Sequence, residues 1–192
     1  MSWADFNIDL QQAGKKYRQH WIFNKLDLKL EIGQSLAILG PNGSGKSTLI
    51  NCISGFTPLS AGKITYSHKG KIYEWDDFYR FVSWSSPSME LLEDLTLSES
   101  INFHIKLKPF IESFSTENLL ESSGLIQSKN KYIRNFSSGM RQRLKLILSI
   151  ACDSPLLLLD EPCTNLDDKG IEWYRNFVLP ELKNRIVIVA SN

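Results

Sequence analysis

The fold class is decided by one stretch, Ser35-Leu36-Ala37-Ile38-Leu39-Gly40-Pro41-Asn42-Gly43-Ser44-Gly45-Lys46-Ser47-Thr48. Its first part, Ser35–Leu39, is almost wholly apolar, which predicts a strand buried on both faces of a parallel sheet. Glycines follow as in a tight turn, and a helix is expected from Lys46 to Ser54. A strand, a Gly-x-x-x-x-Gly-Lys-Ser loop and a helix in this order predict an α/β fold in which backbone N–H groups surround phosphate oxygens.

The loop itself has the residue types that phosphate binding requires. Gly43 and Gly45 permit close approach of the backbone, and Lys46 is expected to reach the β- and γ-phosphates of ATP. The Ser47 hydroxyl is expected to ligate Mg2+, and Thr48 to contact the α-phosphate. Two further predicted nucleotide contacts of the loop are Asn42 and Ser44.

A second run of residues, Leu156-Leu157-Leu158-Leu159-Asp160-Glu161-Pro162, places two carboxylates at the end of a predicted buried strand. In open α/β sheets the ligand lies at the carboxyl ends of the strands. This is the Walker B pattern, in which Asp160 orients Mg2+ through water and Glu161 polarises the water that attacks the γ-phosphate. A strand that ends in acidic residues can also mark the exit of the chain to solvent. The phosphate-binding loop upstream favours the catalytic interpretation.

The remaining elements surround these two strands. Alternation of apolar and polar residues at the start of the chain predicts antiparallel strands. The segment Thr96-Leu97-Ser98-Glu99 matches a capping box and is expected to begin a helical insert. Strands are predicted at residues 6–10, 26–30, 63–66, 71–73, 80–84, 156–159 and 185–190, and helices from Thr96, at 116–123, from Ser138 and at 167–182.

This alternation predicts one α/β domain over residues 1–192. It has a mixed sheet core, an antiparallel β portion at the N-terminus and an inserted α-helical subdomain. The core is expected at residues 1–94 and 153–192, and the helical subdomain at residues 95–152. A chain of 192 residues is long enough to bury a core of this kind without a second domain.

Charge and cysteine content limit the classes of partner and compartment. The 22 basic and 21 acidic residues leave a net charge of +1 and form no long block of one sign, so no nucleic-acid partner is predicted. The three cysteines lack metal-ligand spacing and are odd in number, which suits a reducing compartment. We see no secretory signal, and no apolar run approaches the roughly 20 residues of a membrane-spanning helix. A cytoplasmic location is therefore expected, with membrane association only through a partner.

A third segment, Phe136-Ser137-Ser138-Gly139-Met140-Arg141-Gln142-Arg143, resembles the signature motif of the ATP-binding cassette family. The common form of that motif is Leu-Ser-Gly-Gly-Gln, so Ser138 and Met140 depart from it. The Ser-Ser-Gly-Met-x-Gln-Arg variant resembles that of exporter-type cassettes. Physically, Ser137 followed by a helix N-terminus is a second anion site. With the phosphate-binding loop and Walker B, this makes three family motifs in family order.

The resemblance implies a P-loop NTPase fold and an ATP- and Mg2+-dependent activity. It also implies that Ser137 and Gly139 contact the nucleotide held by another subunit, so that two chains sandwich two ATP molecules head to tail. Residues Thr164-Asn165-Leu166-Asp167 resemble the D-loop, which lies across that dimer interface in the family. The second subunit can be an identical chain or another ATPase of the family. A transmembrane permease subunit would place this chain peripherally on the inner face of the cytoplasmic membrane.

An aromatic residue upstream of the phosphate-binding loop stacks on adenine in this family. Tyr17 lies at the matching position, and Trp21 and Phe23 are close alternatives. Of these two, Phe23 is expected to face the core.

Two positions depart from the family pattern. The family has glutamine after the strand that ends near Trp84, where this chain has Ser85 or Ser86. The strand at the end of the chain leads to a switch histidine in the family, and here it leads to Asn192, which can donate a hydrogen bond to the γ-phosphate but carries no positive charge. Slower hydrolysis is expected. A terminal carboxylate beside phosphates is electrostatically unfavourable, so we also expect a C-terminal extension beyond Asn192 in the natural chain.

Three functions are compatible with these residues. The sequence favours the ATPase subunit of a transporter, and it leaves the substrate and the direction of transport open. A non-transport cassette protein acting on ribosomes or DNA is one alternative, although such chains usually carry two cassettes or coiled-coil arms. A nucleotide-gated binding module that barely hydrolyses ATP is the other, suggested by Ser86 and Asn192. Glu161 argues against this last alternative, because it is the carboxylate that would orient the attacking water.

Overall fold

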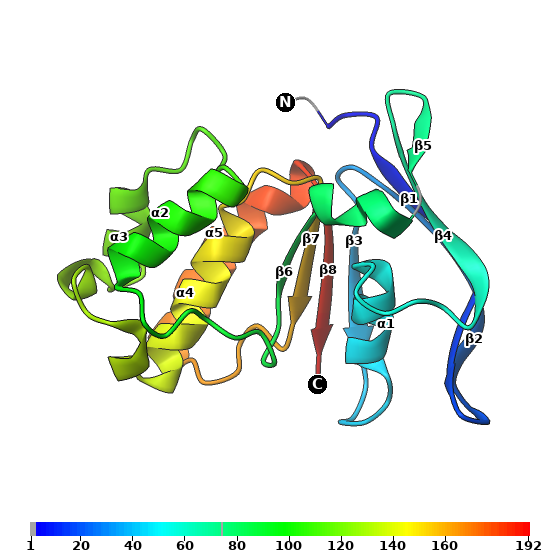
Figure 1. Ribbon diagram of the computed structural model, residues 1–192, viewed down its shortest axis with the longest axis horizontal. Helices are drawn as coiled ribbons and strands as arrows, with labels where there is room; N and C mark the ends of the chain where they lie inside the picture. Colours follow the sequence, from blue (N-terminus) through cyan, green and yellow to red (C-terminus); the bar gives the residue numbers. More distant parts are fainter. Residues whose placement is uncertain (1–2, 74) are drawn as a thin grey trace. The chain divides into compact units, whose positions relative to one another are not determined.

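The computed structural model describes residues 3–73 and 75–192. The chain forms two compact units from alternating segments (Figure 1). The first unit contains the chain up to Trp84, Ser154–Glu161 and Glu181–Asn192. The second unit contains Ser85–Asp153 and Pro162–Pro180. The chain therefore passes between the units after residues 84, 153, 161 and 180.

An antiparallel sheet with the strand order β2-β1-β4-β5 forms one part of the first unit. The predicted antiparallel start of the chain is thereby confirmed, because β1 pairs with β2 and places Ile8 opposite Leu30. Both strands are longer than their alternating segments, since they continue through register shifts after Leu10, and Gln12 in this region has a φ of 48°. The bounds are Asn7–Tyr17 for β1, His20–Glu31 for β2, Ala61–His68 for β4 and Lys71–Tyr73 for β5.

A second sheet of the first unit has the order β3-β8-β7-β6. Strand β8 (Ile186–Ser191) pairs in parallel with both β3 (Ser35–Leu39) and β7 (Leu156–Asp160). Every residue of β7 is buried, as its continuous apolar run predicts. The strand β6 comprises Val82–Ser85, and the helix α1, which follows the glycine-rich loop, comprises Lys46–Ile53. The α/β fold with a mixed sheet core is thus confirmed.

The predicted burial of β3 on both faces is wrong. Leu39 is 73% exposed, and Ser35 and Ala37 are also exposed. Strand β3 lies at the edge of its sheet, and α1 packs on β7 and β8 rather than on β3. An apolar run therefore identified the strand but not its place in the sheet.

The second unit is helical. Two of its helices begin at the capping residues that the sequence indicates, Thr96 and Ser137, and a third is capped by Ser115. Each of these side chains accepts a hydrogen bond from a backbone N–H of the first turn. The predicted subdomain of residues 95–152 makes up most of this unit, and that domain division stays a prediction. The bounds are Leu97–Leu107 for α2, Thr116–Ser122 for α3, Ser138–Ile150 for α4 and Asp168–Val178 for α5, with short 3-10 turns at Ile126–Ser128 and Ile133–Asn135.

The helix predicted from Asp167 to Leu182 is two elements. Asp167 is the N-cap of α5, and its side chain accepts from the Gly170 N–H. The α-helix ends at Val178, and a 3-10 helix follows over Leu179–Lys183. Pro180 explains the change, because proline has no N–H to continue the α-helical ladder.

Each unit has its own apolar core. The core of the first unit lies between its sheets and α1, and includes a stacked pair of rings, Tyr66 and Phe78, with centroids 3.9 Å apart. The core of the second unit lies among its helices. Its buried members are Leu97, Ile101, Leu119, Leu120, Leu125, Ile133, Phe136, Leu144, Ile147, Leu148 and Ala151. No helix within the described residues is long and apolar enough to cross a membrane.

Replacing Thr96 with alanine is expected to lower the free energy of unfolding by about 1 kcal/mol. The Thr96 side chain accepts from the Glu99 N–H, and the Thr96 N–H donates to the Glu99 carboxylate at 2.8 Å. Urea unfolding followed by circular dichroism measures the change. Glu99→Gln is the matched control, because glutamine preserves the capping box. Equal midpoints for wild type and Thr96→Ala would show that this box contributes nothing to stability.

Candidate functional site

The glycine-rich loop connects β3 to α1 in the first unit. Gly43 and Gly45 have φ values of 81° and 97°, in the left-handed region that glycine adopts most easily. A Cβ on Gly45 would clash with the Cγ2 of Ile22, so no larger residue fits there without a shift. Gly45 is also the N-cap of α1, which points its free N–H groups at the loop. The loop therefore has the backbone geometry of an anion site.

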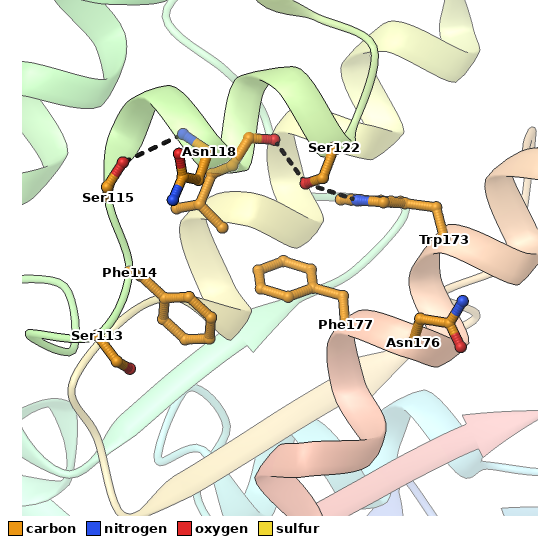
Figure 2. A pocket seen from close by; sticks show the side chains of 9 residues that line it. Ser113, Phe114, Ser115, Asn118, Ser122, Trp173, Asn176 and Phe177 are labelled. Carbon is orange, nitrogen blue, oxygen red and sulfur yellow. Dashed lines mark hydrogen bonds between the residues drawn. The ribbon is translucent and has the colours of Figure 1, made fainter.

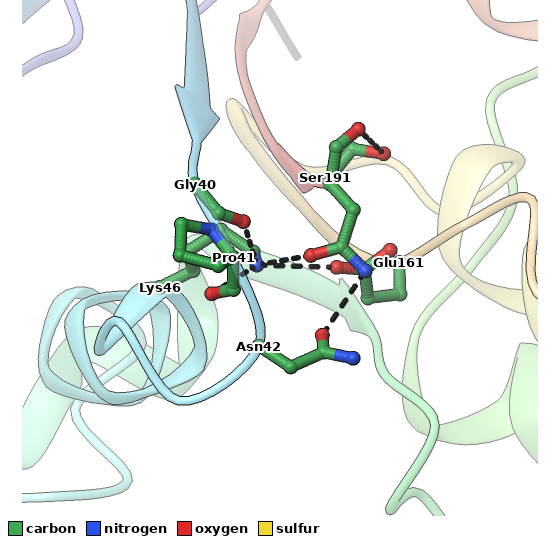
Figure 3. A network of polar contacts seen from close by, with 7 residues as sticks. Gly40, Pro41, Asn42, Lys46, Glu161 and Ser191 are labelled. Atoms are coloured by element: carbon green, nitrogen blue, oxygen red, sulfur yellow. Dashed lines mark hydrogen bonds and ion pairs between the residues drawn. The ribbon is translucent and has the colours of Figure 1, made fainter.

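Lys46 is the centre of a polar network at this loop (Figure 3). Its side chain is 6% exposed, and its Nζ donates to the Gly40 carbonyl at 2.6 Å and to the Pro41 carbonyl at 3.2 Å. The same Nζ donates to Asn192 Oδ1 at 2.8 Å and lies 3.5 Å from Glu161 Oε1. The structure thus brings together the three residues that the sequence predicts to be catalytic, from α1 and the ends of β7 and β8.

Asn192 connects this lysine to the loop. While its Oδ1 accepts from Lys46, its Nδ2 donates to Asn42 Oδ1 at 3.0 Å. Both polar atoms of the Asn192 amide are therefore used, one on Lys46 and one on Asn42. An amide can do this because it has a donor and an acceptor at its two ends.

Two carboxylates end the buried strand β7. Asp160 is 3% exposed, and burial raises the pKa of its carboxyl group, with a smaller contribution from Glu161. A hydrogen bond from Ser47 and the charge of Lys46 act in the opposite direction on this pKa. Asp160 Oδ1 and Glu161 Oε1 are buried without a hydrogen-bond partner. A hard cation beside Ser47 and Asp160 would satisfy such oxygens, so these residues fit Mg2+.

Glu161 has a backbone conformation that is rare for a residue with a side chain. Its φ is 47°, and its N–H donates to the Ala190 carbonyl at 2.9 Å. Such left-handed residues persist where the surrounding structure determines them, often at functional sites. Here the conformation ends the strand and directs the carboxylate at Lys46.

The candidate adenine-stacking residues differ in exposure. Tyr17, at the end of β1, is 52% exposed, and Lys15 Nζ lies 5.1 Å from its ring centroid. Trp21 is 37% exposed, with Lys16 Nζ at 5.3 Å. Phe23 packs against the core of the first unit, as expected. The structure leaves the rings of Tyr17 and Trp21 accessible.

Ser137 and Gly139 form a separate group in the second unit. Ser137 is exposed and caps α4, accepting from the Met140 N–H at 3.3 Å. A Cβ on Gly139 would lie 3.1 Å from the Asn165 carbonyl, so the helix start approaches the loop after β7 closely. Like Gly45 in the first unit, this helix start has backbone N–H groups that could face an anion.

The second unit also has a hollow of about 290 Å3 that differs in chemistry from both of these groups (Figure 2). It is lined by the aromatic rings of Phe114, Trp173 and Phe177 together with serine and asparagine side chains. None of its lining residues is charged.

A family model described as ABC transporter matches residues 23–164 of this chain. That range includes the glycine-rich loop, α4 and β7. The chain belongs to the ABC transporter family.

Relatives and solved structures of this family agree over most of the chain. A probable ABC transporter ATP-binding protein of Campylobacter jejuni is 32% identical over 86% of this chain and 71% of its own length. A lantibiotic transport ATP-binding protein of Streptococcus pyogenes is 27% identical over 96% of this chain and 79% of its own. The structure of an ATP-binding subunit of an ABC transporter superposes with a TM-score of 0.81 at 22% identity, covering 96% of this chain and 79% of that one, and shows the same fold.

This ABC protein is accordingly an ATP-binding subunit of a transporter and an ATPase with a P-loop NTPase fold. The structure locates the two positions at which the sequence predicts a departure from the family pattern. Ser85 is the last residue of β6 and Ser86 follows it, with exposed fractions of 0% and 1%. The Ser86 hydroxyl lies 3.0 Å from the Ser88 hydroxyl. Asn192, the second departure, is the residue that links Lys46 to Asn42.

One group of polar contacts in this ABC protein was missed by sequence reasoning. Arg141, Gln142 and Lys145 of α4 contact backbone carbonyls and an acidic side chain of neighbouring loops. Their spacing on one helix could have indicated a shared face. Their partners could not have been found from residue types, because most of these partners are backbone carbonyls, which every residue has.

Proposed function

We propose that this chain binds ATP with Mg2+, closes head to tail with a second ATPase subunit around two ATP molecules, and drives a separate transmembrane permease by hydrolysis. One observation supports this most directly. Lys46, Glu161 and Asn192, which are far apart in the sequence, meet within one polar network at the glycine-rich loop. A site that only stores nucleotide would not need a carboxylate in that network.

In this proposal the loop positions the triphosphate. The backbone N–H groups of Asn42 to Thr48 contact the phosphates, and the Lys46 amine leaves the Gly40 and Pro41 carbonyls for phosphate oxygens. The Tyr17 ring stacks on adenine, because it is exposed at the end of β1. These contacts bind the substrate in both its ground state and its transition state.

In this proposal the carboxylates at the end of β7 act on the metal and on the attacking water. Ser47 would hold Mg2+ directly and Asp160 would hold it through water. When bound, the ion neutralises charge that develops on the phosphates. Glu161 Oε1 orients the water and accepts its proton, since this oxygen has no hydrogen-bond donor of its own. Asn192 donates its amide hydrogen to the γ-phosphate in place of Asn42.

In this proposal each chain supplies one half of each of two ATP sites, and the dimer completes both. Ser137 and Gly139 start a helix of thirteen residues, α4, whose free N–H groups would face the γ-phosphate on the other subunit. Residues Thr164–Asp167 would lie across the interface. We also propose that the single domain, with its helical subdomain at residues 95–152, sits peripherally on the inner face of the cytoplasmic membrane through the permease.

A complementation experiment tests the shared sites. Neither Lys46→Met nor Ser137→Arg alone is expected to release phosphate at the wild-type rate. An equal mixture should regain activity, because a head-to-tail heterodimer has one site with an intact Lys46 and an intact Ser137. A mixture no more active than its components would contradict the head-to-tail arrangement.

Asn192→His is expected to raise the rate of phosphate release up to about fivefold below pH 6.5, because a charged donor to phosphate contributes about 1 kcal/mol more than a neutral one. The gain should fade as the pH rises, since imidazolium loses its charge near pH 6.5 in its ordinary state. Asn192→Leu, which has a similar size and no donor, should lower the rate. If the Asn192→His variant had the same rate and pH profile as wild type, the proposed contact between Asn192 and the γ-phosphate would be contradicted.

A second candidate function is a nucleotide-gated module that hydrolyses ATP slowly. The uncharged Asn192 beside Lys46 favours it, because the γ-phosphate then meets one cationic side chain fewer. Saturable ATP binding with phosphate release that does not respond to Glu161→Gln would support this candidate over the first.

A further inference from the structure

One face of α4 binds two segments of the chain that are far apart in the sequence. Lys145 Nζ donates to the Pro87 carbonyl at 3.0 Å and to the Ser86 carbonyl at 3.3 Å. Three residues earlier on the same helix, Gln142 Nε2 donates to the Pro162 carbonyl at 2.8 Å, and Gln142 is 4% exposed. Residues three apart are neighbours on a helix surface. One helix face therefore binds backbone carbonyls of two different loops.

These carbonyls belong to residues at the start of the two segments that make up the second unit. Residues Ser86 and Pro87 come directly after β6, and the chain enters the second unit at Ser85. Pro162 comes directly after Glu161, where the chain enters the unit again. The helix that begins beside Ser137 thus holds the first residues after two strands of the parallel sheet.

The segment after β6 is a compact turn that Lys145 completes. The Met89 N–H donates to the Ser86 carbonyl at 3.2 Å, and the Ser86 and Ser88 hydroxyls lie 3.0 Å apart. Lys145 binds the same Ser86 carbonyl from the other side. Further along, Glu93 is paired with Arg141, one turn before Lys145 on α4. Both ends of the segment 86–93 are therefore attached to one helix.

Burial of the Lys145 charge does not by itself stabilise the folded chain. Burial lowers the pKa of its amine, and the neighbouring Arg141 lowers this pKa further. Within the described residues no carboxylate lies at ion-pair distance from Lys145, whereas Arg141 has Glu93. A partly buried cation without a counter-charge costs free energy, and its two carbonyl contacts act against that cost. A neutral side chain at this position would avoid that cost.

We propose that Lys145 is a positioning residue of the ATPase cycle, which ties residues 86–89 to the helix that begins at Ser137 and Gly139. When those two residues engage ATP, the segment after β6 follows α4 through this lysine. The resemblance to the family places a glutamine at Ser85 or Ser86, and the side chain of Ser86 is buried against Ser88. The backbone contacts of Lys145 then supply the link that the short side chain does not. This role rests on the proposed function.

Amide hydrogen exchange of the ligand-free chain tests the link itself. The peptide spanning residues 86–92 should exchange about tenfold faster in Lys145→Met than in wild type, as expected for the loss of two hydrogen bonds. Lys145→Arg, which keeps the charge and the donors, should restore slow exchange. Lys129→Met, which removes a half-buried lysine of the same unit that pairs with Glu117, should leave the peptide unchanged. Equal exchange in wild type and Lys145→Met would overturn the proposal.

A second arm adds Mg-ATP in a Glu161→Gln background, with ATP binding measured on the same samples. The peptide should change its exchange on ATP addition when Lys145 is present, and should not when methionine replaces it, although ATP is bound in both. If Lys145 only stabilised the structure, ATP addition would change the exchange of this peptide equally with lysine and with methionine at position 145. If ATP fails to bind, the proposed function fails while the ligand-free arm still decides whether Lys145 holds the segment.

Discussion

Glu161→Gln is expected to slow phosphate release by about 10²- to 10³-fold, within the range for losing a general base. Glutamine has nearly the same shape as glutamate, but its amide cannot accept a proton from the attacking water. Glu161 Oε1 lies 3.5 Å from Lys46 Nζ and is buried without a hydrogen-bond partner, so the proposed water would supply the donor that it lacks. ATP binding should be retained, because the loop contacts are unchanged.

Steady-state phosphate release at saturating ATP and Mg2+ measures this effect. Glu172→Gln is a matched control, since it makes the same change at an exposed glutamate of α5. A Glu161→Gln variant as active as wild type would exclude the proposed role of this carboxylate. The slowed variant also provides a chain that holds ATP long enough for binding and exchange experiments.

Lys46→Met is expected to weaken ATP binding by about 10²-fold, because two charge-assisted hydrogen bonds to phosphate contribute about 1.5–3 kcal/mol each and are partly offset by the lost contacts to carbonyls. The Lys46 side chain is 6% exposed, so its amine already lies inside the loop. Methionine keeps most of the stem and removes the charge.

Titration with a fluorescent ATP analogue gives the dissociation constant. Lys29→Met is the control, since Lys29 is an exposed lysine of β2 with a 60% exposed side chain. Unaltered affinity in Lys46→Met, with the protein still folded, would show that the nucleotide does not bind at this loop.

Much of the fold could be predicted because local patterns determined it. The capping box at Thr96 and the cap at Ser137 marked helix starts, and the apolar run of β7 marked a buried strand. The place of β3 at the sheet edge could not be predicted, because strand order depends on long-range pairing. The lengths of β1 and β2 were underestimated, because their register shifts at residues such as Gln12 interrupt the alternation on which the prediction relied.

Part of the candidate site could likewise be predicted from the sequence, and part could not. Lys46, Asp160 and Glu161 follow from motif and spacing, and the structure places them at or after the carboxyl ends of β3 and β7, which both pair in parallel with β8 between them. The hydrogen bond between Asn192 and Asn42 spans 150 residues, so no local pattern predicts it. Lys145 was missed for a different reason. Its partners are backbone carbonyls, and a sequence does not show which carbonyls a lysine will meet.

The most direct test of the central claim is the rate of phosphate release per chain, measured at saturating ATP and Mg2+ over a wide range of protein concentration. A chain whose active sites are shared between two subunits should show a rate per chain that rises with concentration and then reaches a plateau. A measurable rate per chain that stays constant down to samples in which the chain is monomeric would mean that one subunit holds a complete site, and would contradict the head-to-tail account.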